Sequence, residues 1–118
     1  MQIQLNTDNN IVGRDELASR VEASVGDALG RFSEQITRVE VHLGDVNSHK
    51  GGADDIRCMI EARLAGRDPV AVTHQAPDIE LALNGAIGKV RRALDTVVGK
   101  QNDHQAAARR DSSGLPGA

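Results

Sequence analysis

Apolar residues recur at two different spacings along this chain, and the order in which the two spacings follow one another restricts the folds that the chain can adopt. Ile3 and Leu5 lie between polar neighbours, and the same period of two returns three times in the middle of the chain. This period is typical of strands with one buried face, whereas steps of three and four are typical of amphipathic helices. The pattern predicts strands over residues 2–6, 39–44, 57–64 and 70–74, and helices over residues 14–36 and 79–100.

The predicted order β-α-β-β-β-α indicates an α+β fold. Each helix has one apolar stripe and each strand has one apolar face, so both helices are expected to cover the same face of a four-stranded sheet. The result is a two-layer sandwich whose other sheet face lies in water. The side chains expected on that open face are Gln2, Gln4, Glu40, His42, Arg57, Glu61 and Arg63.

The length of 118 residues predicts a single domain. Apolar residues make up 39% of the chain and charged residues 26%, which is the composition of an ordinary globular protein. We assign residues 1–100 to this domain. Residues 101–118 are polar and small, with Gly, Ser and Pro at the end, and we expect them to form a flexible polar tail.

The sequence also indicates in which cellular compartment the protein resides and whether it spans a membrane. No segment approaches the roughly 20 apolar residues of a membrane helix, and the N-terminus lacks the basic start and apolar run of a secretory signal. We therefore expect a cytoplasmic protein with no membrane partner. Cys58 is the only cysteine, so it cannot form an internal disulfide.

The sequence contains no recognisable catalytic or metal-binding motif. No serine or cysteine lies in a nucleophile turn, and residues 49–52 (HKGG) lack the order of a phosphate-binding loop. His42 and Cys58 fall on opposite faces of their predicted strands, and no pair of His and Cys residues has a recognised ligand spacing. An edge histidine and a buried thiol are therefore expected rather than a metal site. We expect a protein that is not an enzyme, with no cofactor, no metal and no small-molecule substrate.

The charge distribution favours a nucleic-acid partner only at the C-terminal third. The formal net charge is −3, yet residues 79–118 hold six basic and four acidic groups. Phe32 is the only aromatic residue, so the chain has no platform on which bases could stack. Any binding of nucleic acid must therefore use phosphates, sugars and shape.

A ridge of basic residues is expected along the last helix. At 100° per residue, Lys89, Arg92 and Lys100 fall on one flank of its polar side, and Arg91 falls on the opposite flank near Asp95. A ridge of this kind can neutralise several phosphates. The alternative is a solvated helix face whose cations lie favourably near the helix C-terminus. The glycines at positions 85 and 88 are also expected on the exposed side, where they would permit close approach of a partner.

Three segments resemble a known family. They are residues 3–11 (IQLNTDNNI), residues 39–43 (VEVHL) and residues 78–94 (DIELALNGAIGKVRRAL). The chain resembles the ribosome hibernation promoting factor and ribosome-associated inhibitor family, also called sigma-54 modulation proteins, from residue 2 to about residue 100. The residues that match fixed positions of its C-terminal signature are Asp78, Ala82, Lys89, Arg92 and Leu94.

The resemblance implies a function in translation under stress. Proteins of this bacterial family have the β-α-β-β-β-α fold, bind the small ribosomal subunit in the channel of mRNA and tRNA, and silence or protect idle ribosomes. Basic residues on the helices contact rRNA phosphates. This implies an RNA-binding role for Lys89 and Arg92 first, and for Arg91 and Lys100 as neighbouring candidates. The chain lacks the separate C-terminal domain of long members, so it is not expected to pair ribosomes through that domain.

Departures from the family pattern leave a second hypothesis open. Ser24 and Asp27 stand where lysines are common on the first helix, and Glu80 and Asn84 stand where the family commonly has Tyr and Asp. The alternative is a family-derived, stress-related module that binds another protein and no longer binds the ribosome.

Overall fold

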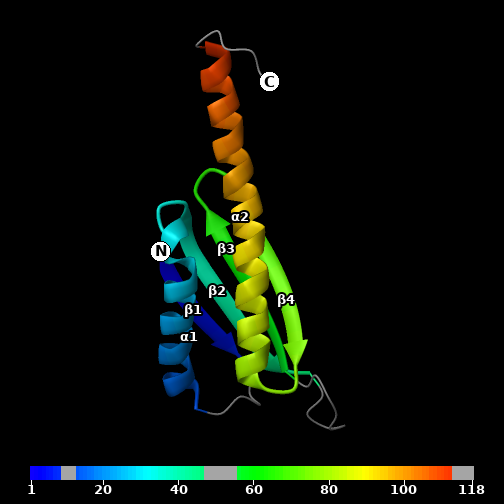
Figure 1. Ribbon diagram of the computed structural model, residues 1–118. Helices are drawn as coiled ribbons and strands as arrows, with labels where there is room; N and C mark the ends of the chain where they lie inside the picture. The colour runs from blue at the N-terminus through cyan, green and yellow to red at the C-terminus, as the bar shows by residue number, and fades with distance from the viewer. Residues whose placement is uncertain (9–12, 47–55, 113–118) are drawn as a thin grey trace.

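A four-stranded sheet and two helices make up the computed structural model (Figure 1). The structure describes the backbone of residues 1–8, 13–46 and 56–112, and the side chains of these segments as far as Gly99. In chain order the elements are β1 (Gln2–Thr7), α1 (Arg14–Leu29), a 3₁₀ turn (Gly30–Phe32), β2 (Ile36–Asp45), β3 (Ile56–Leu64), β4 (Val70–Ala76) and α2 (Ile79–Ser112).

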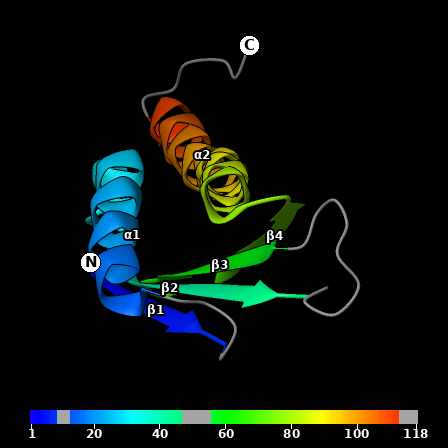
Figure 2. The ribbon, with the colours of Figure 1, turned by 90° about the horizontal axis from the view of Figure 1, so that it is seen from below.

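The strands lie in the sheet in the order in which they occur in the chain. β1 and β2 are parallel, because the chain returns through α1 before it enters β2. β3 runs antiparallel to both of its neighbours, β2 and β4. Both helices lie on one face of the sheet, with α1 over β1 and β2 and α2 over β3 and β4 (Figure 2). The predicted α+β sandwich is therefore confirmed.

The core lies between the sheet and the two helices. The alternating apolar residues of β2 and β3 point toward the helices, as the period of two predicted, and the helices meet them with their apolar stripes. Among these residues, each fully buried valine, leucine or isoleucine side chain stabilises the fold by about 1.5–3 kcal/mol. Those with no exposed surface include Val21, Val25, Leu29, Val39, Val41, Cys58, Ile60, Ala62, Val90 and Leu94.

The first helix is shorter than its apolar period predicted. Steps of three and four continue as far as Ile36, but α1 ends at Leu29 and a 3₁₀ turn follows. Ile36 begins β2 instead. The apolar spacing could not show whether residues 30–36 continue the helix or leave it, because Phe32 and Ile36 are buried in the core in either case. In the structure Phe32 is buried from the turn and Ile36 from the sheet.

The second helix is longer than predicted. Its backbone continues to Ser112, past the end expected near residues 99–100. Residues 101–112 contain Gln, Ala and Arg, which favour helix, and no Gly or Pro. The flexible polar tail over residues 101–118 and the domain boundary at residue 100 both stay predictions.

Residues 9–12, which include the end of the matched segment 3–11, and residues 47–55 lie outside the described residues. In the part of the chain that the structure describes, no helix is both long enough and apolar enough to cross a membrane.

Candidate nucleic-acid interface

Lys89 and Arg92 lie on the flank of α2 that faces β4, and we call these two residues the basic ridge. One stripe of α2 is buried against the sheet, which leaves both side chains of the ridge exposed. Their spacing of three residues places them on one side of the helix, one turn apart. Neither side chain forms an ion pair with another described residue.

The structure anchors the Lys89 end of the basic ridge. Lys89 Nζ donates a hydrogen bond to the backbone carbonyl oxygen of Thr73 in β4, at 2.9 Å. An ammonium group has three donors, so two N–H groups remain for a phosphate. The guanidinium of Arg92 lies beside Gly88, where an added Cβ would be 3.4 Å from Nη1. The basic ridge therefore presents one anchored cation and one cation at the helix surface.

The expectation that Gly85 leaves room for a partner is wrong. A Cβ at Gly85 would lie 2.1 Å from Cδ2 of His74, so the imidazole ring occupies the space above this glycine. His74 lies on the helix-facing side of β4, in phase with Val70 and Val72, but no local pattern in the sequence signals its contact with Gly85. Gly85 thus lets α2 and β4 approach each other, and does not admit an external partner.

Arg91 lies on the other flank of α2, toward α1. It lines a groove between the two helices together with Asp27, Ala28, Arg31 and Asp95. We call these five residues the interhelical groove. Arg91 lies near its i+4 neighbour Asp95, as expected, but Asp95 forms its ion pair with Arg31. The backbone of Lys100 belongs to α2, and its side chain lies beyond the described ones.

Two ion pairs join α1 and its following turn to α2. Arg20 pairs with Glu80 and Arg31 pairs with Asp95. The guanidinium of Arg31 also lies over the ring of Phe32, 4.6 Å from its centroid. Sequence reasoning missed these contacts, because Arg31 and Asp95 are 64 residues apart and no local pattern signals their approach.

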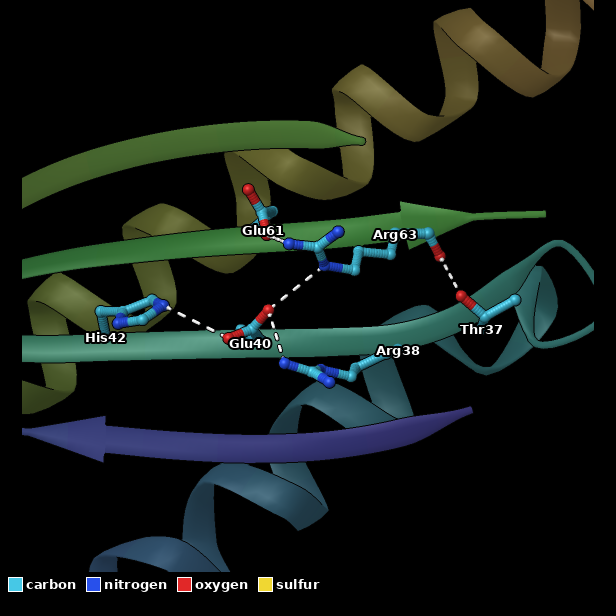
Figure 3. A network of polar contacts seen from close by, with 6 residues as sticks. All are labelled: Thr37, Arg38, Glu40, His42, Glu61 and Arg63. Carbon is cyan, nitrogen blue, oxygen red and sulfur yellow. Dashed lines mark hydrogen bonds and ion pairs between the residues drawn. The ribbon is translucent and has the colours of Figure 1, made fainter. Parts of the chain in front are cut away.

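The open face of the sheet carries a network of charges centred on Glu40 (Figure 3). Arg38 Nη2 lies 3.0 Å and Arg63 Nε 3.3 Å from Glu40 Oε2, and His42 Nε2 lies 3.9 Å from Oε1. Arg63 also pairs with Glu61 at 3.1 Å. The hydrogen bond from Arg38, followed by that from Arg63, lowers the pKa of Glu40 below its ordinary value despite partial desolvation. Because its carboxylates neutralise Arg38 and Arg63, this face is less suited to phosphate than the basic ridge.

Cys58 and His42 are two further residues whose side chains could carry chemistry. Cys58 is fully buried, and burial raises the pKa of its thiol to about 12, so the reactive thiolate is scarce at neutral pH. His42 lies on the opposite face of the sheet, as predicted from the strand pattern. Among the described side chains, no three His, Cys, Asp or Glu residues lie close enough together to hold a metal ion.

Comparisons with known proteins agree with this architecture. The model of the family described as Sigma 54 modulation protein / S30EA ribosomal protein matches residues 5–102. The N-terminal domain of Protein Y from Thermus thermophilus is 19% identical with a TM-score of 0.65, and the match covers 82% of this chain and 99% of that domain. A ribosomal subunit interface protein from Coxiella burnetii is 12% identical with a TM-score of 0.59, covering 84% of this chain and 99% of the other. A search of curated proteins gave no match.

The two kinds of match carry different weight. At these identities the solved structures establish the fold alone. The family match rests on the sequence itself and runs from within β1 to residue 102 in α2, so it includes α1, β2, β3 and β4 in full. The chain therefore belongs to the Sigma 54 modulation protein / S30EA ribosomal protein family.

Proposed function

We propose that this protein binds the small ribosomal subunit near the channel of mRNA and tRNA, and silences or protects idle ribosomes in the cytoplasm without catalysing a reaction. Membership of a family of ribosome-associated factors supports the partner. The structural neighbour from Coxiella burnetii is itself described as a ribosomal subunit interface protein. The absence of aromatic platforms favours contact with rRNA phosphates rather than with bases.

The observation that carries the proposal is the basic ridge. Lys89 and Arg92 are exposed, lie one turn apart and have no carboxylate partner among the described side chains. Cations in this arrangement can each take one phosphate, and each phosphate contact adds about one unit to the slope of log K against log salt. Arg91 and Lys100 are proposed as additional contacts on the same helix.

Replacing the basic ridge tests this role. The double variant K89Q/R92Q removes two charges, and glutamine at position 89 can still donate a hydrogen bond toward Thr73. We expect affinity for purified small subunits to fall about tenfold or more, and the salt slope to fall by about two, as measured by co-sedimentation from 50 to 300 mM salt.

The matched control is R57Q/R67Q. It removes the same number of charges from exposed positions on β3 and on the turn before β4. Thermal unfolding of both variants checks that the fold is intact. Equal affinity of K89Q/R92Q, the control and the unmodified protein would show that the basic ridge is not the contact.

A second candidate function has one observation in its favour. The exposed residues of α1 include four carboxylates, at Asp15, Glu16, Glu22 and Asp27, which would repel rRNA near that helix. A basic protein surface could bind there instead. If the unmodified protein fails to bind small subunits even at 50 mM salt, the ribosome proposal fails and this protein–protein hypothesis becomes the better one.

A further inference from the structure

We propose that the interhelical groove is a second phosphate-binding site, and that the carboxylate of Asp95 occupies the place of an RNA backbone phosphate in the free protein. The groove contains two arginines, one from each side. Arg31 projects from the turn after α1, and Arg91 projects from α2. The inference rests on the proposed function, because it names a further contact and a regulating residue of the same RNA-binding surface.

Arg31 is held in position before any ligand arrives. Its Nη2 donates to Oδ1 of Asp95, and its guanidinium lies over the ring of Phe32. Phe32 is only 5% exposed, so this ring is a fixed part of the core. A guanidinium offers five donors in a planar fork that fits a phosphate as well as a carboxylate. The groove therefore already displays the geometry of a bound anion.

Arg91 supplies the second cation. Its side chain is exposed, lines the same groove, and forms no hydrogen bond or ion pair with the described residues. Asp27 also lines the groove, and no ion pair joins it to either arginine. A phosphate that replaced Asp95 could contact Arg31 and Arg91 together, whereas the carboxylate pairs with Arg31 alone.

Replacing the Asp95 carboxylate by a phosphate as the partner of Arg31 costs little free energy. The side chains of Arg31 and Asp95 are 59% and 49% exposed, and ion pairs this open to water contribute little to stability. A phosphate carries more acceptor oxygens and can use both arginines. Asp95 therefore lowers the affinity for RNA without closing the groove, because the incoming phosphate must displace it.

The second interhelical ion pair provides a matched contrast. Arg20 pairs with Glu80 in a pocket that also holds Asp78, and no second cation lines that pocket among the residues that the structure describes. Releasing Arg20 leaves one arginine beside a remaining carboxylate. E80Q and D95N each remove one negative charge and one interhelical ion pair, but only D95N frees an arginine that has a second cation, Arg91, in the same groove.

The experiment compares D95N with E80Q in the small-subunit binding assay across the same salt series. We expect D95N to raise affinity about threefold to tenfold and to steepen the salt slope by about one unit, because one more phosphate is contacted. E80Q should change affinity less than twofold. Adding R91A to D95N should cancel most of the gain.

Titration with inorganic phosphate gives a readout that does not depend on the ribosome. The Nε–Hε NMR signals of Arg31 and Arg91, assigned with R31K and R91K, should shift together, and at a lower phosphate concentration in D95N than in the unmodified protein. Thermal unfolding of each variant shows that the groove is still formed.

The outcomes separate the two proposals. Equal gains for D95N and E80Q would overturn the groove as a site, since net charge alone would explain them. If D95N has no effect while K89Q/R92Q weakens binding, the groove is excluded and the proposed function stands. If no variant binds small subunits, the proposed function fails, and the phosphate titration decides the groove: joint shifts in D95N support it, and unshifted arginine signals exclude it.

Discussion

At Gly85, one added side-chain carbon would disturb the packing of α2 against β4. An added Cβ would meet Cδ2, Nε2 and Cγ of His74 at 2.1, 2.3 and 2.6 Å. One turn further along the same helix, Lys89 bonds to the carbonyl of Thr73, next to His74 in β4. Gly85 and Lys89 together therefore fix how closely α2 approaches the edge strand, and so where the basic ridge lies.

We expect G85A to destabilise the protein by about 1–3 kcal/mol, because the imidazole must leave its place or the helix must move away from β4. The higher helix propensity of alanine offsets up to about 1 kcal/mol of this loss. Urea unfolding followed by circular dichroism measures the change.

Gly99 is the matched control in the same helix, since nothing lies within 4 Å of its Cβ position. G99A should leave stability unchanged or raise it by about 0.5–1 kcal/mol. H74A introduced into G85A should recover much of the lost stability. If G85A and G99A were equally stable, the contact with His74 would not limit the packing.

At the scale of secondary-structure elements, the charge network joins β2 to β3 across the open face of the sheet. Glu40 on β2 accepts from Arg63 on β3 and from Arg38 on its own strand. The side chain of Glu40 is 14% exposed, which makes it the most enclosed member of the network. Removing its charge leaves Arg38 and Arg63 without their shared partner, which weakens the pairing of the two strands.

The network makes stability depend on pH in the acidic range. The pKa of Glu40 is lowered in the folded protein by Arg38 and Arg63, whereas in the unfolded chain it takes the ordinary value of 4.5. Its contribution is therefore present above about pH 4.5 and is lost as the pH falls through the lower folded value. We expect the melting temperature to fall more steeply between pH 5 and pH 3 in the unmodified protein than in E40Q.

The control variant E22Q removes a carboxylate from the exposed surface of α1. Its melting temperature should still fall steeply between pH 5 and pH 3. Thermal melts at four pH values between 3 and 7 measure all three proteins. Parallel pH profiles for the unmodified protein and E40Q would show that the network has no part in acid stability.

At the scale of the whole molecule, one core joins the sheet to both helices. Cys58 lies in β3, with β2 and β4 on either side, and has no exposed surface. Because the sheet is covered on this face by both helices, a reagent can reach the thiol only when the sheet and helices separate. The reactivity of Cys58 therefore reports the opening of the domain as a unit.

We expect iodoacetamide to label Cys58 at least about 100-fold more slowly in buffer at pH 8 than in 8 M urea, because burial both encloses the thiol and raises its pKa to about 12. Since the folded pKa lies above the ordinary value of 9.0, this thiol favours the folded state below pH 9 and progressively less as the pH rises toward 12.

Two further measurements check the interpretation. Labelling in intermediate urea should follow the unfolding curve, and C58A should remain unlabelled under every condition. Rapid labelling in buffer, with the protein still folded by circular dichroism, would contradict a single closed core.

The order of strands and helices and the buried face of each strand could be predicted, because the two apolar spacings are local properties of the sequence. Val39, Val41 and Ile60 lie on the core side as their alternation indicates. The ends of the helices could not be predicted equally well. The residue Ile36 continues a helical spacing and yet belongs to β2, because a core position can be filled from either element.

The sequence by itself determined the fold class and the open face of the sheet, because these follow from periodicity. It also pointed to Lys89 and Arg92 through helical spacing and matched motif positions, and their RNA-binding role stays a prediction. Only the tertiary structure decided that His74 covers Gly85, that Asp95 pairs with Arg31, and that Arg31 shares a groove with Arg91. Such contacts join residues distant in the chain, and their formation depends on how α1 and α2 are placed on the sheet rather than on any local spacing.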